Sequence, residues 1–373
     1  MYVVCVFLKE NVKKLIYMYK QYWIFLVFIV GFTSFTIGQE LKPKAVYYPG
    51  PQWEVVDRPE VLGLSSAGLA KAKEYAGTIN TAAVMVVVDG KVAYQWGDVD
   101  KKFNAHSIRK SFLSAIYGKY VQAGLIDLDA TMADLGIDDV EGLSEEELKA
   151  TVRDCLKARS GVYHPALYES AGMKRLKPAR HSEKAGTHWY YNNWDFNVLG
   201  TIFEQQTKQK IFETIESDIA KPIGMQDYTA ADGSYVSGEE SKHNAYPFRV
   251  TARDLARFGW LMLNHGKWLD KQVIDSAWVE ESTRYHSDAA LYSSSGYGYL
   301  WWVARDFNKY PHLQHVHVPE GSYSARGSGG HLVVVIPDFN MVVVHRVNTD
   351  IRGNSVSYED FGRLLGLILD ARM

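Results

Sequence analysis

In its first third the chain reads Ala105-His106-Ser107-Ile108-Arg109-Lys110-Ser111-Phe112. A polar loop precedes this stretch, and apolar residues then recur at four-residue spacing, at Ile108, Phe112, Ile116 and Tyr120. This periodicity predicts a helix that begins near Ser107 and buries one face. The helix therefore carries a serine at its start and a lysine one turn later.

Ser107 and Lys110 are three residues apart, so their side chains share one face of the predicted helix and the amine can reach the hydroxyl. A serine in the first turn also lies at the positive end of the helix dipole, which stabilises an oxyanion. The pattern by itself allows Ser107 to act as a nucleophile with Lys110 as its base. Because a free lysine has a pKa of about 10.4, burial or neighbouring cations must lower the pKa of Lys110. The competing interpretation is a helix-capping serine and a surface lysine.

A second polar segment reads Thr187-His188-Trp189-Tyr190-Tyr191-Asn192-Asn193 and leads into a predicted helix over residues 195–206. A tyrosine and an asparagine two residues apart at such a junction can present a phenol and an amide to one cleft. Two registers fit, Tyr190 with Asn192 and Tyr191 with Asn193. Aromatic core packing with an asparagine cap is the alternative.

A third segment reads Ala325-Arg326-Gly327-Ser328-Gly329-Gly330-His331 and enters an apolar run over residues 332–336. Glycines beside a buried strand allow close backbone approach to a ligand and expose N–H groups. A glycine-rich turn before a core strand explains the same residues without a ligand.

The surrounding pattern predicts an α/β fold. Segments 82–88 and 91–96 flank Asp89-Gly90, a strong hairpin signal, and β-rich segments return late. The middle is helical. We expect an antiparallel sheet flanked by N- and C-terminal helices, built from about residues 45–106 and 290–373, with a mostly α-helical lobe over about 107–289 inserted between the strands. One predicted helix is capped by Ser65 or Ser66 and runs to about Ala76. The other predicted helices cover 144–158, 195–206, 211–219, 251–263 and 358–371, and the late strands cover 297–303, 332–336 and 341–347.

The chain has 373 residues, of which 47% are hydrophobic and 23% charged, as in globular proteins. A net charge of −2 gives no basic surplus for nucleic acid. Lysines precede an apolar run over 22–32, and small residues follow it. This order predicts a cleaved signal peptide over residues 1–38, a mature domain over 39–373, and export to the periplasm or the medium. Met18 is a second possible start, and an uncleaved membrane anchor is the alternative. No stable anchor is expected after cleavage.

Together the three polar segments resemble the penicillin-recognising serine hydrolases, in particular the class C β-lactamase-like branch with its carboxylesterases and 6-aminohexanoate-dimer hydrolases. The resemblance extends from about Trp53 to Asn348. It implies the serine β-lactamase-like fold, an acyl-enzyme on Ser107, and no metal or organic cofactor. It also includes three stretches without obvious chemistry, at residues 156–161, 254–259 and 297–302.

The resemblance implies a role for each site residue. Ser107 is the nucleophile and Lys110 its base. The family tyrosine precedes a Leu-Gly pair by eight and nine positions, which selects Tyr191, with Asn193 as its partner. Gly327 and Ser328 contribute to substrate binding, and the backbone N–H groups of Ser107 and Ser328 form the oxyanion hole.

One departure from the family pattern concerns the substrate. β-Lactamases and D-alanyl peptidases keep a lysine or histidine where this chain has Ala325, and that residue helps to bind the substrate carboxylate. Arg326 is adjacent, but side chains alternate along a strand, so we expect it on the opposite face. A small neutral ester or amide therefore fits better than a β-lactam or a D-amino peptide, which remain alternative substrates.

Two further interpretations come from other functional classes. One is a catalytically inactive binding protein on the same fold. The other is a metallohydrolase that uses His312, His315 and His317, because His315 and His317 would share one strand face and could bind zinc. No His-Glu-x-x-His pattern accompanies them.

Overall fold

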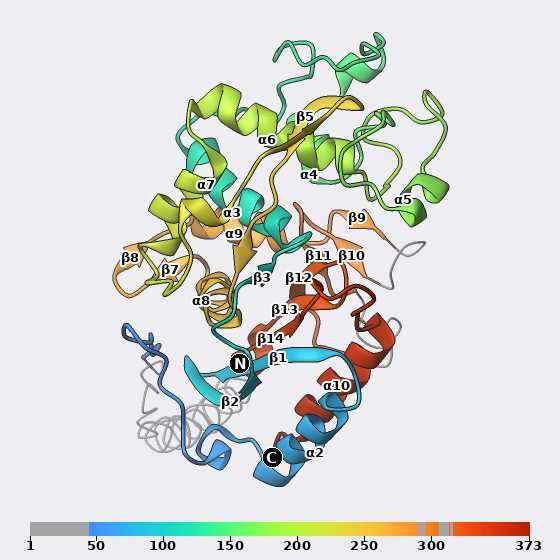
Figure 1. Cartoon of the computed structure of the whole chain (residues 1–373). Helices are drawn as coiled ribbons and strands as arrows, with labels where there is room; N and C mark the ends of the chain where they lie inside the picture. The colour runs from blue at the N-terminus through green and yellow to red at the C-terminus, as the bar shows by residue number, and fades with distance from the viewer. Residues whose placement is uncertain (1–44, 290–294, 306–312, 314–315) are drawn as a thin grey trace, which may run out of the picture. The chain divides into compact units, whose positions relative to one another are not determined.

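The computed structural model describes residues 45–289, 295–305, 313 and 316–373. Strands from both ends of this part form one eight-stranded antiparallel sheet in the order β2-β1-β14-β13-β12-β11-β10-β9 (Figure 1). The bounds are β1 Thr81–Val88, β2 Lys91–Gly97, β9 Ser287–Asp288, β10 Gly296–Tyr297, β11 Trp302–Val303, β12 Tyr323–Gly327, β13 His331–Ile336 and β14 Met341–Val347. The late strand β14 lies between β13 and the early strand β1.

The predicted hairpin at Asp89-Gly90 is present, and its geometry explains the sequence. Asp89 has a φ of 52° and Gly90 a φ of 79°, the positive values that a two-residue hairpin turn requires. The valine-rich strands β1, β13 and β14 are buried on both faces, because helices cover both sides of the sheet.

Alternate side chains of the central strands enter two separate cores. Val84, Val334 and Val343 pack toward α2 (Ser66–Ala76) and α10 (Tyr358–Asp370). Met85, Val333 and Val342 belong to a larger core with α3 and α8. The sheet thus separates the two terminal helices from the helical part of the chain, and this arrangement confirms the predicted fold class.

Helices and short hairpins occupy the stretch between β2 and β9 (Figure 1). The α-helices are α3 Ile108–Gln122, α4 Val152–Leu156, α5 Ala171–Leu176, α6 Asn193–Thr207, α7 Ile211–Thr214, α8 Ala252–Leu263 and α9 Ser276–Thr283. The short strands are β3 Phe103–Asn104, β4 Val236–Gly238, β5 Ser241–Ala245, β6 Arg249–Val250, β7 Lys267–Trp268 and β8 Lys271–Gln272. The 3₁₀ turns are Pro59–Leu62, Glu147–Lys149, Ala230–Asp232 and Pro337–Phe339, and Ile215–Ala220 is a π-helical segment.

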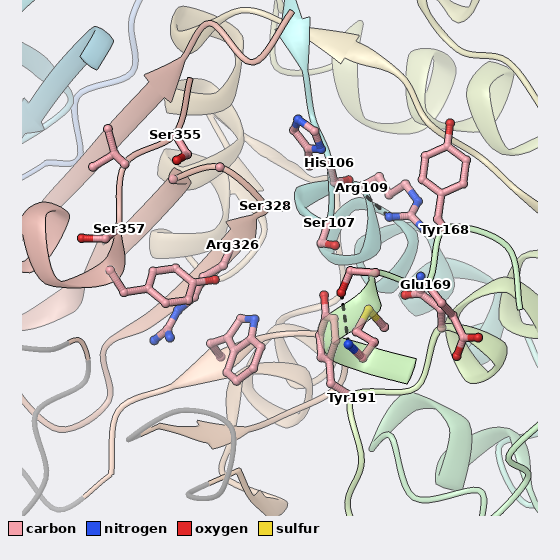
Figure 2. Close-up of a pocket in the computed structure, with 18 residues that line it drawn as sticks. His106, Ser107, Arg109, Tyr168, Glu169, Tyr191, Arg326, Ser328, Ser355 and Ser357 are labelled. Carbon is pink, nitrogen blue, oxygen red and sulfur yellow. Dashed lines mark hydrogen bonds between the residues drawn. The ribbon is translucent and has the colours of Figure 1, made fainter. Parts of the chain in front are cut away.

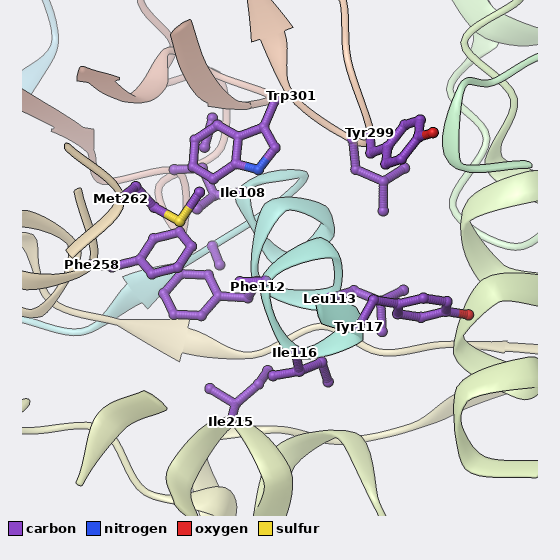
Figure 3. Packing of buried hydrophobic residues seen from close by; sticks show 14 of the residues in the cluster. Ile108, Phe112, Leu113, Ile116, Tyr117, Ile215, Phe258, Met262, Tyr299 and Trp301 are labelled. Atoms are coloured by element: carbon purple, nitrogen blue, oxygen red, sulfur yellow. The ribbon is translucent and has the colours of Figure 1, made fainter. Parts of the chain in front are cut away.

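Helix α3 passes through the larger core and is buried on nearly all sides, beyond the single apolar face that its sequence predicts. Phe112 stacks on Phe258 of α8 with ring centroids 3.8 Å apart, and Ile116 and Tyr117 extend the contact along the helix (Figure 3). A helix held from all sides keeps the residues of its first turn in fixed positions.

Two predicted elements are wrong in extent. The expected helix over 144–158 breaks at Ala150: Ser144 and Glu147 form their reciprocal capping bonds, but Thr151 and Asp154 form a second capping box that restarts the chain as the short α4. The expected strand over 297–303 is two short strands, β10 and β11. Leu300 has a φ of 63° in the turn between them, and Gly298 donates to the Trp301 carbonyl at 2.8 Å.

The predicted signal peptide and its apolar run over 22–32 lie outside the described residues, so export stays a prediction. Across residues 45–373, with the gaps given above, none of the helices combines the length and hydropathy needed to cross a bilayer.

Candidate active site

A cavity of about 570 Å³ opens where the start of α3, the end of β12 and the start of α10 meet (Figure 2). Ser107, Tyr191, Asn193 and Ser328 all border it, so the structure brings together residues from three distant segments. Lys110 lies behind them and is 2% exposed. The lining residues are His106, Ser107, Arg109, Tyr168, Glu169, Ser170, Met173, Tyr191, Asn193, Trp302, Arg326, Ser328, Gly329, Gly330 and Ser355 to Tyr358.

Lys110 contacts three of the predicted site residues at once. Its Nζ atom lies 2.9 Å from Ser107 Oγ, 2.9 Å from the Tyr191 hydroxyl and 3.0 Å from Asn193 Oδ1. Uncharged, the amine would donate its two hydrogens to Asn193 and Tyr191 and keep its lone pair for the Ser107 proton. The geometry therefore suits transfer of a proton from serine to lysine.

The surroundings of Lys110 favour that uncharged form. Burial holds the pKa of Lys110 well below its usual value, and the positive charge of Arg109 lowers it further. A lysine whose pKa is lowered is uncharged in a larger share of the molecules and can act as a general base.

The start of α6 places Tyr191 and Asn193. Asn192 caps the helix, donates to the Val162 carbonyl at 2.7 Å and to Asp195 Oδ1 at 2.8 Å, and so points away from the cavity. Asp195, which is buried, also accepts a 2.5 Å bond from Ser160. With Asn192 tied to the backbone, the neighbouring Tyr191 and Asn193 side chains are the pair that reaches Lys110.

The adjacent Tyr190 offers a matched comparison for Tyr191. Tyr191→Phe should lower kcat by about 10²-fold or more, the scale of an acid–base contribution, because only the hydroxyl at Lys110 is removed. Tyr190 donates to the Met173 carbonyl at 2.7 Å instead, so Tyr190→Phe should cost about 1 kcal/mol of stability and leave kcat nearly unchanged. Steady-state kinetics and thermal melts of both variants check this, and the reverse ranking would show that the register is wrong.

Strand β12 approaches the start of α3 very closely at Gly327. A Cβ atom there would lie 2.8 Å from the Ala105 carbonyl oxygen and 3.1 Å from the Cβ atoms of His106 and His331. Because backbone on the α3 side cannot retreat easily, only glycine lets β12 and the following Ser328 lie beside Ser107.

Gly327→Val should therefore displace β12 from the start of α3 and lower kcat/KM at least about 10-fold, since misplacement by 1 Å can cost 10²-fold. The same substitution at Gly50, which is exposed, has open space around its Cβ position and has no positive φ, controls for a general effect of valine. Equal activity of the two variants would show that the close approach is unimportant.

A network that the sequence analysis missed fixes His106, the residue before Ser107. His106 has a φ of 48°, a sparsely populated conformation for a non-glycine residue. Its Nε2 lies 2.8 Å from Thr349 Oγ1, and its ring lies 5.0 Å from that of His331. Arg346 donates to His331 Nδ1 at 3.0 Å and to the carbonyl oxygens of Phe103, Asn104 and Val250. Arg346 of β14 thus fixes the position of the segment that leads into Ser107.

Ala325 and Arg326 lie on opposite faces of β12, as predicted, but this does not keep Arg326 away from the cavity. Ala325 is fully buried in the larger core, and Arg326 lies on the opposite face of β12. The cavity, however, extends past the end of the strand to Ser355 and Tyr358, so Arg326 borders it. The Arg326 guanidinium lies 4.9 Å from the Trp302 ring, and burial lowers its pKa to about 10.

Of the three histidines of the metallohydrolase alternative, His312 and His315 lie outside the described residues. His317 is described and is exposed. Within the described residues there is no group of three or more His, Cys, Asp or Glu side chains arranged to hold a metal ion.

Comparison with known proteins agrees with this arrangement. The family model described as beta-lactamase matches residues 67–366. An uncharacterised protein of Alkalihalophilus pseudofirmus is 24% identical over 274 residues, which cover 67% of this chain and 74% of that protein. Protein flp of Staphylococcus aureus is 24% identical over 47% of this chain, and the match spans only 39% of that protein.

Solved structures with the same fold include several hydrolases. A Bacillus anthracis protein described provisionally as a 6-aminohexanoate-dimer hydrolase has a TM-score of 0.59 at 22% identity, with 80% of each chain covered. A penicillin-binding protein homologue from Caulobacter crescentus has a TM-score of 0.61 at 15% identity, covering 86% of this chain and 99% of that one. EstCE1, a hydrolase with promiscuous acyltransferase activity, has a TM-score of 0.57 at 14% identity, covering 84% and 98%.

Proposed function

The chain belongs to the beta-lactamase family and is a hydrolase of that fold, and on this premise we propose that it cleaves an ester or amide bond through an acyl-enzyme on Ser107. One observation carries the proposal. Lys110 Nζ lies within 3.0 Å of Ser107 Oγ, the Tyr191 hydroxyl and Asn193 Oδ1 together. A surface lysine beside a helix cap would have no reason for such burial and such contacts.

In the first half of the reaction, Lys110 takes the proton of Ser107 as Oγ attacks the carbonyl carbon. The Lys110–Tyr191 pair then delivers a proton to the departing alcohol or amine. In the second half, the same pair removes a proton from water as it attacks the acyl carbon and returns a proton to Ser107. Asn193 holds the amine in position for both halves.

The negative charge that develops on the carbonyl oxygen needs donors. In the described part of the chain, the backbone N–H groups of Ser107 and Ser328 donate no hydrogen bond, and both residues border the cavity. The positive end of α3 lies at the same place. We therefore assign these two N–H groups to the oxyanion hole.

Labelling with a fluorophosphonate followed by mass spectrometry tests the nucleophile. The adduct should map to Ser107 and be absent from Ser107→Ala. Ser355→Ala is the matched control, because Ser355 borders the same cavity but is not among the hydrogen-bond partners of Lys110. An adduct on another serine, or none in the active protein, would refute the proposal.

A substrate panel separates the remaining alternatives within the family. Short-chain aryl esters should be hydrolysed, and linear amides, a cephalosporin and a D-amino peptide should be measured beside them. Turnover of the β-lactam or the D-amino peptide above that of the esters would identify the chain as a β-lactamase or peptidase. Labelling without turnover of any of them would favour the binding protein.

A further inference from the structure

Arg109 follows Ser107 by two residues and borders the same cavity, yet only 3% of it is exposed. Figure 2 shows it beside Tyr168 and Glu169 on one side of Ser107, whereas Arg326 lies with Ser355 and Ser357 on the other. The proposed reaction uses Ser107 and Lys110 directly, whereas the charge of Arg109 acts in it only at a distance, by lowering the pKa of Lys110.

The charge of Arg109 is poorly compensated. Its Nη1 atom donates to the His106 carbonyl at 3.4 Å, a long bond. Its Nε and Nη2 atoms are buried and have no hydrogen-bond partner, and in the described part of the chain no carboxylate forms an ion pair with it. The rings of Tyr246 and Tyr168, at 4.9 and 5.9 Å, are its main electrostatic neighbours. Arginine stays protonated when buried, so this arrangement costs stability in the free protein.

The unpaired atoms form a recognisable donor pattern. Nε and Nη2 make up one edge of the planar guanidinium, and that edge matches the two oxygens of a carboxylate. Glu169, the acidic residue on the same wall, is already engaged, because Lys177 pairs with it at 2.5 Å and the Ala166 N–H donates to it at 3.3 Å. An anion that enters the cavity would therefore supply the hydrogen-bond acceptors that Nε and Nη2 of Arg109 lack.

We propose that Arg109 forms an anion subsite, so that the preferred substrate is an ester or amide that also carries a carboxylate. This inference rests on the proposed function, and it departs from the neutral substrate that Ala325 suggests. Tyr168 is half-exposed and lies near the guanidinium. Its side chain must therefore move for the carboxylate to reach Nε and Nη2.

Matched substrates test the subsite on the unaltered protein. On the acyl side, 4-nitrophenyl hemiglutarate is compared with 4-nitrophenyl pentanoate, in which a methyl group replaces the carboxylate. On the leaving-group side, 4-acetoxybenzoate is compared with its methyl ester. At least one anionic member should have a kcat/KM about 10-fold or more above its neutral partner, the scale of a charge-assisted hydrogen bond. Equal rates, or faster hydrolysis of both neutral esters, would overturn the subsite.

Variants connect the preference to Arg109. Arg109→Gln should abolish the preference, and Arg109→Lys should keep part of it, since the charge stays but the fork is lost. Only the ratio of the two rates counts, because removal of the charge beside Lys110 changes the proton affinity of the base for both substrates alike. Arg175→Gln, which removes an exposed charge from α5 outside the cavity, is the control and should keep the preference.

A preference that survives Arg109→Gln, or that disappears in Arg175→Gln, would count against the subsite. Ser107→Ala, measured in parallel, separates this result from a failure of the proposed function. Hydrolysis that depends on Ser107 but shows no preference removes only the subsite, whereas hydrolysis that persists without Ser107 removes the proposed nucleophile.

Discussion

Replacement of Ser107 by alanine should lower kcat by at least about 10³-fold, because catalytic serines that act as a unit with their base contribute on this scale or above. The fold should stay intact. Ser107 occupies the N-cap position of α3, but its side chain makes no capping bond there, and its Oγ atom is bonded to Lys110 Nζ instead. Alanine therefore removes the hydroxyl without opening the helix or leaving a large void.

The measurement needs two readouts on the same preparation. Steady-state hydrolysis of an aryl ester gives kcat, and a thermal melt gives stability, which should change little. Retention of more than about a tenth of the wild-type kcat would exclude Ser107 as nucleophile. A large drop in melting temperature would show that the loss of activity has a structural cause.

Lys110→Met should be nearly as damaging, with a loss of about 10²–10⁴-fold in kcat, the typical contribution of a general base. Methionine fills a similar volume but accepts no proton. In the wild-type protein kcat/KM should rise with pH through the lowered pKa of Lys110, since only the uncharged amine accepts the serine proton. In the variant that dependence should vanish.

Lys110 also makes stability depend on pH. Its folded pKa is lowered, so between that pKa and the unfolded value near 10.4 the unfolded state binds more protons, and stability falls as the pH drops through this window. Below the folded pKa the penalty is fully present. Urea unfolding of the wild type and of Lys110→Met at several pH values in this range measures the effect. The free energy of unfolding should change less with pH in the variant than in the wild type. Identical slopes would mean that Lys110 is not perturbed.

Local spacing predicted much of this molecule, because some contacts are set within a few residues. Ser107 and Lys110 meet since they are one helical turn apart, and the Asp89-Gly90 hairpin follows from the φ values its residues tolerate. The helix over 358–371 and the strand over 341–347 also form close to their predicted bounds.

Contacts between distant segments were out of reach of that reasoning. Nothing in the sequence near Arg346 indicates that it binds the carbonyl oxygens of Phe103 and Asn104, more than 200 residues earlier. The residues over 168–173 and 355–358 border the cavity only because tertiary packing brings them there. Arg326 is another example. The alternation of side chains along β12 predicts which face it lies on, but whether the cavity reaches that face depends on the start of α10.

The position of β14 has a consequence for the order of events during synthesis. The ribosome completes every other strand of the sheet first, yet β14 lies in its middle, between β1 and β13, and carries Arg346. Until β14 inserts, β1 lacks its central neighbour, and the segment before Ser107 lacks its hydrogen bonds to Arg346. In the nascent chain the site around Ser107 is therefore not yet assembled, and the proposed activity should arise late, in one step with the closing of the sheet. Sheets built from such sequence-distant pairs also fold slowly. Joining residue 373 to residue 63, whose backbone groups already share a 2.9 Å hydrogen bond, and opening the chain elsewhere would move β14 ahead of β1 and bring that step forward.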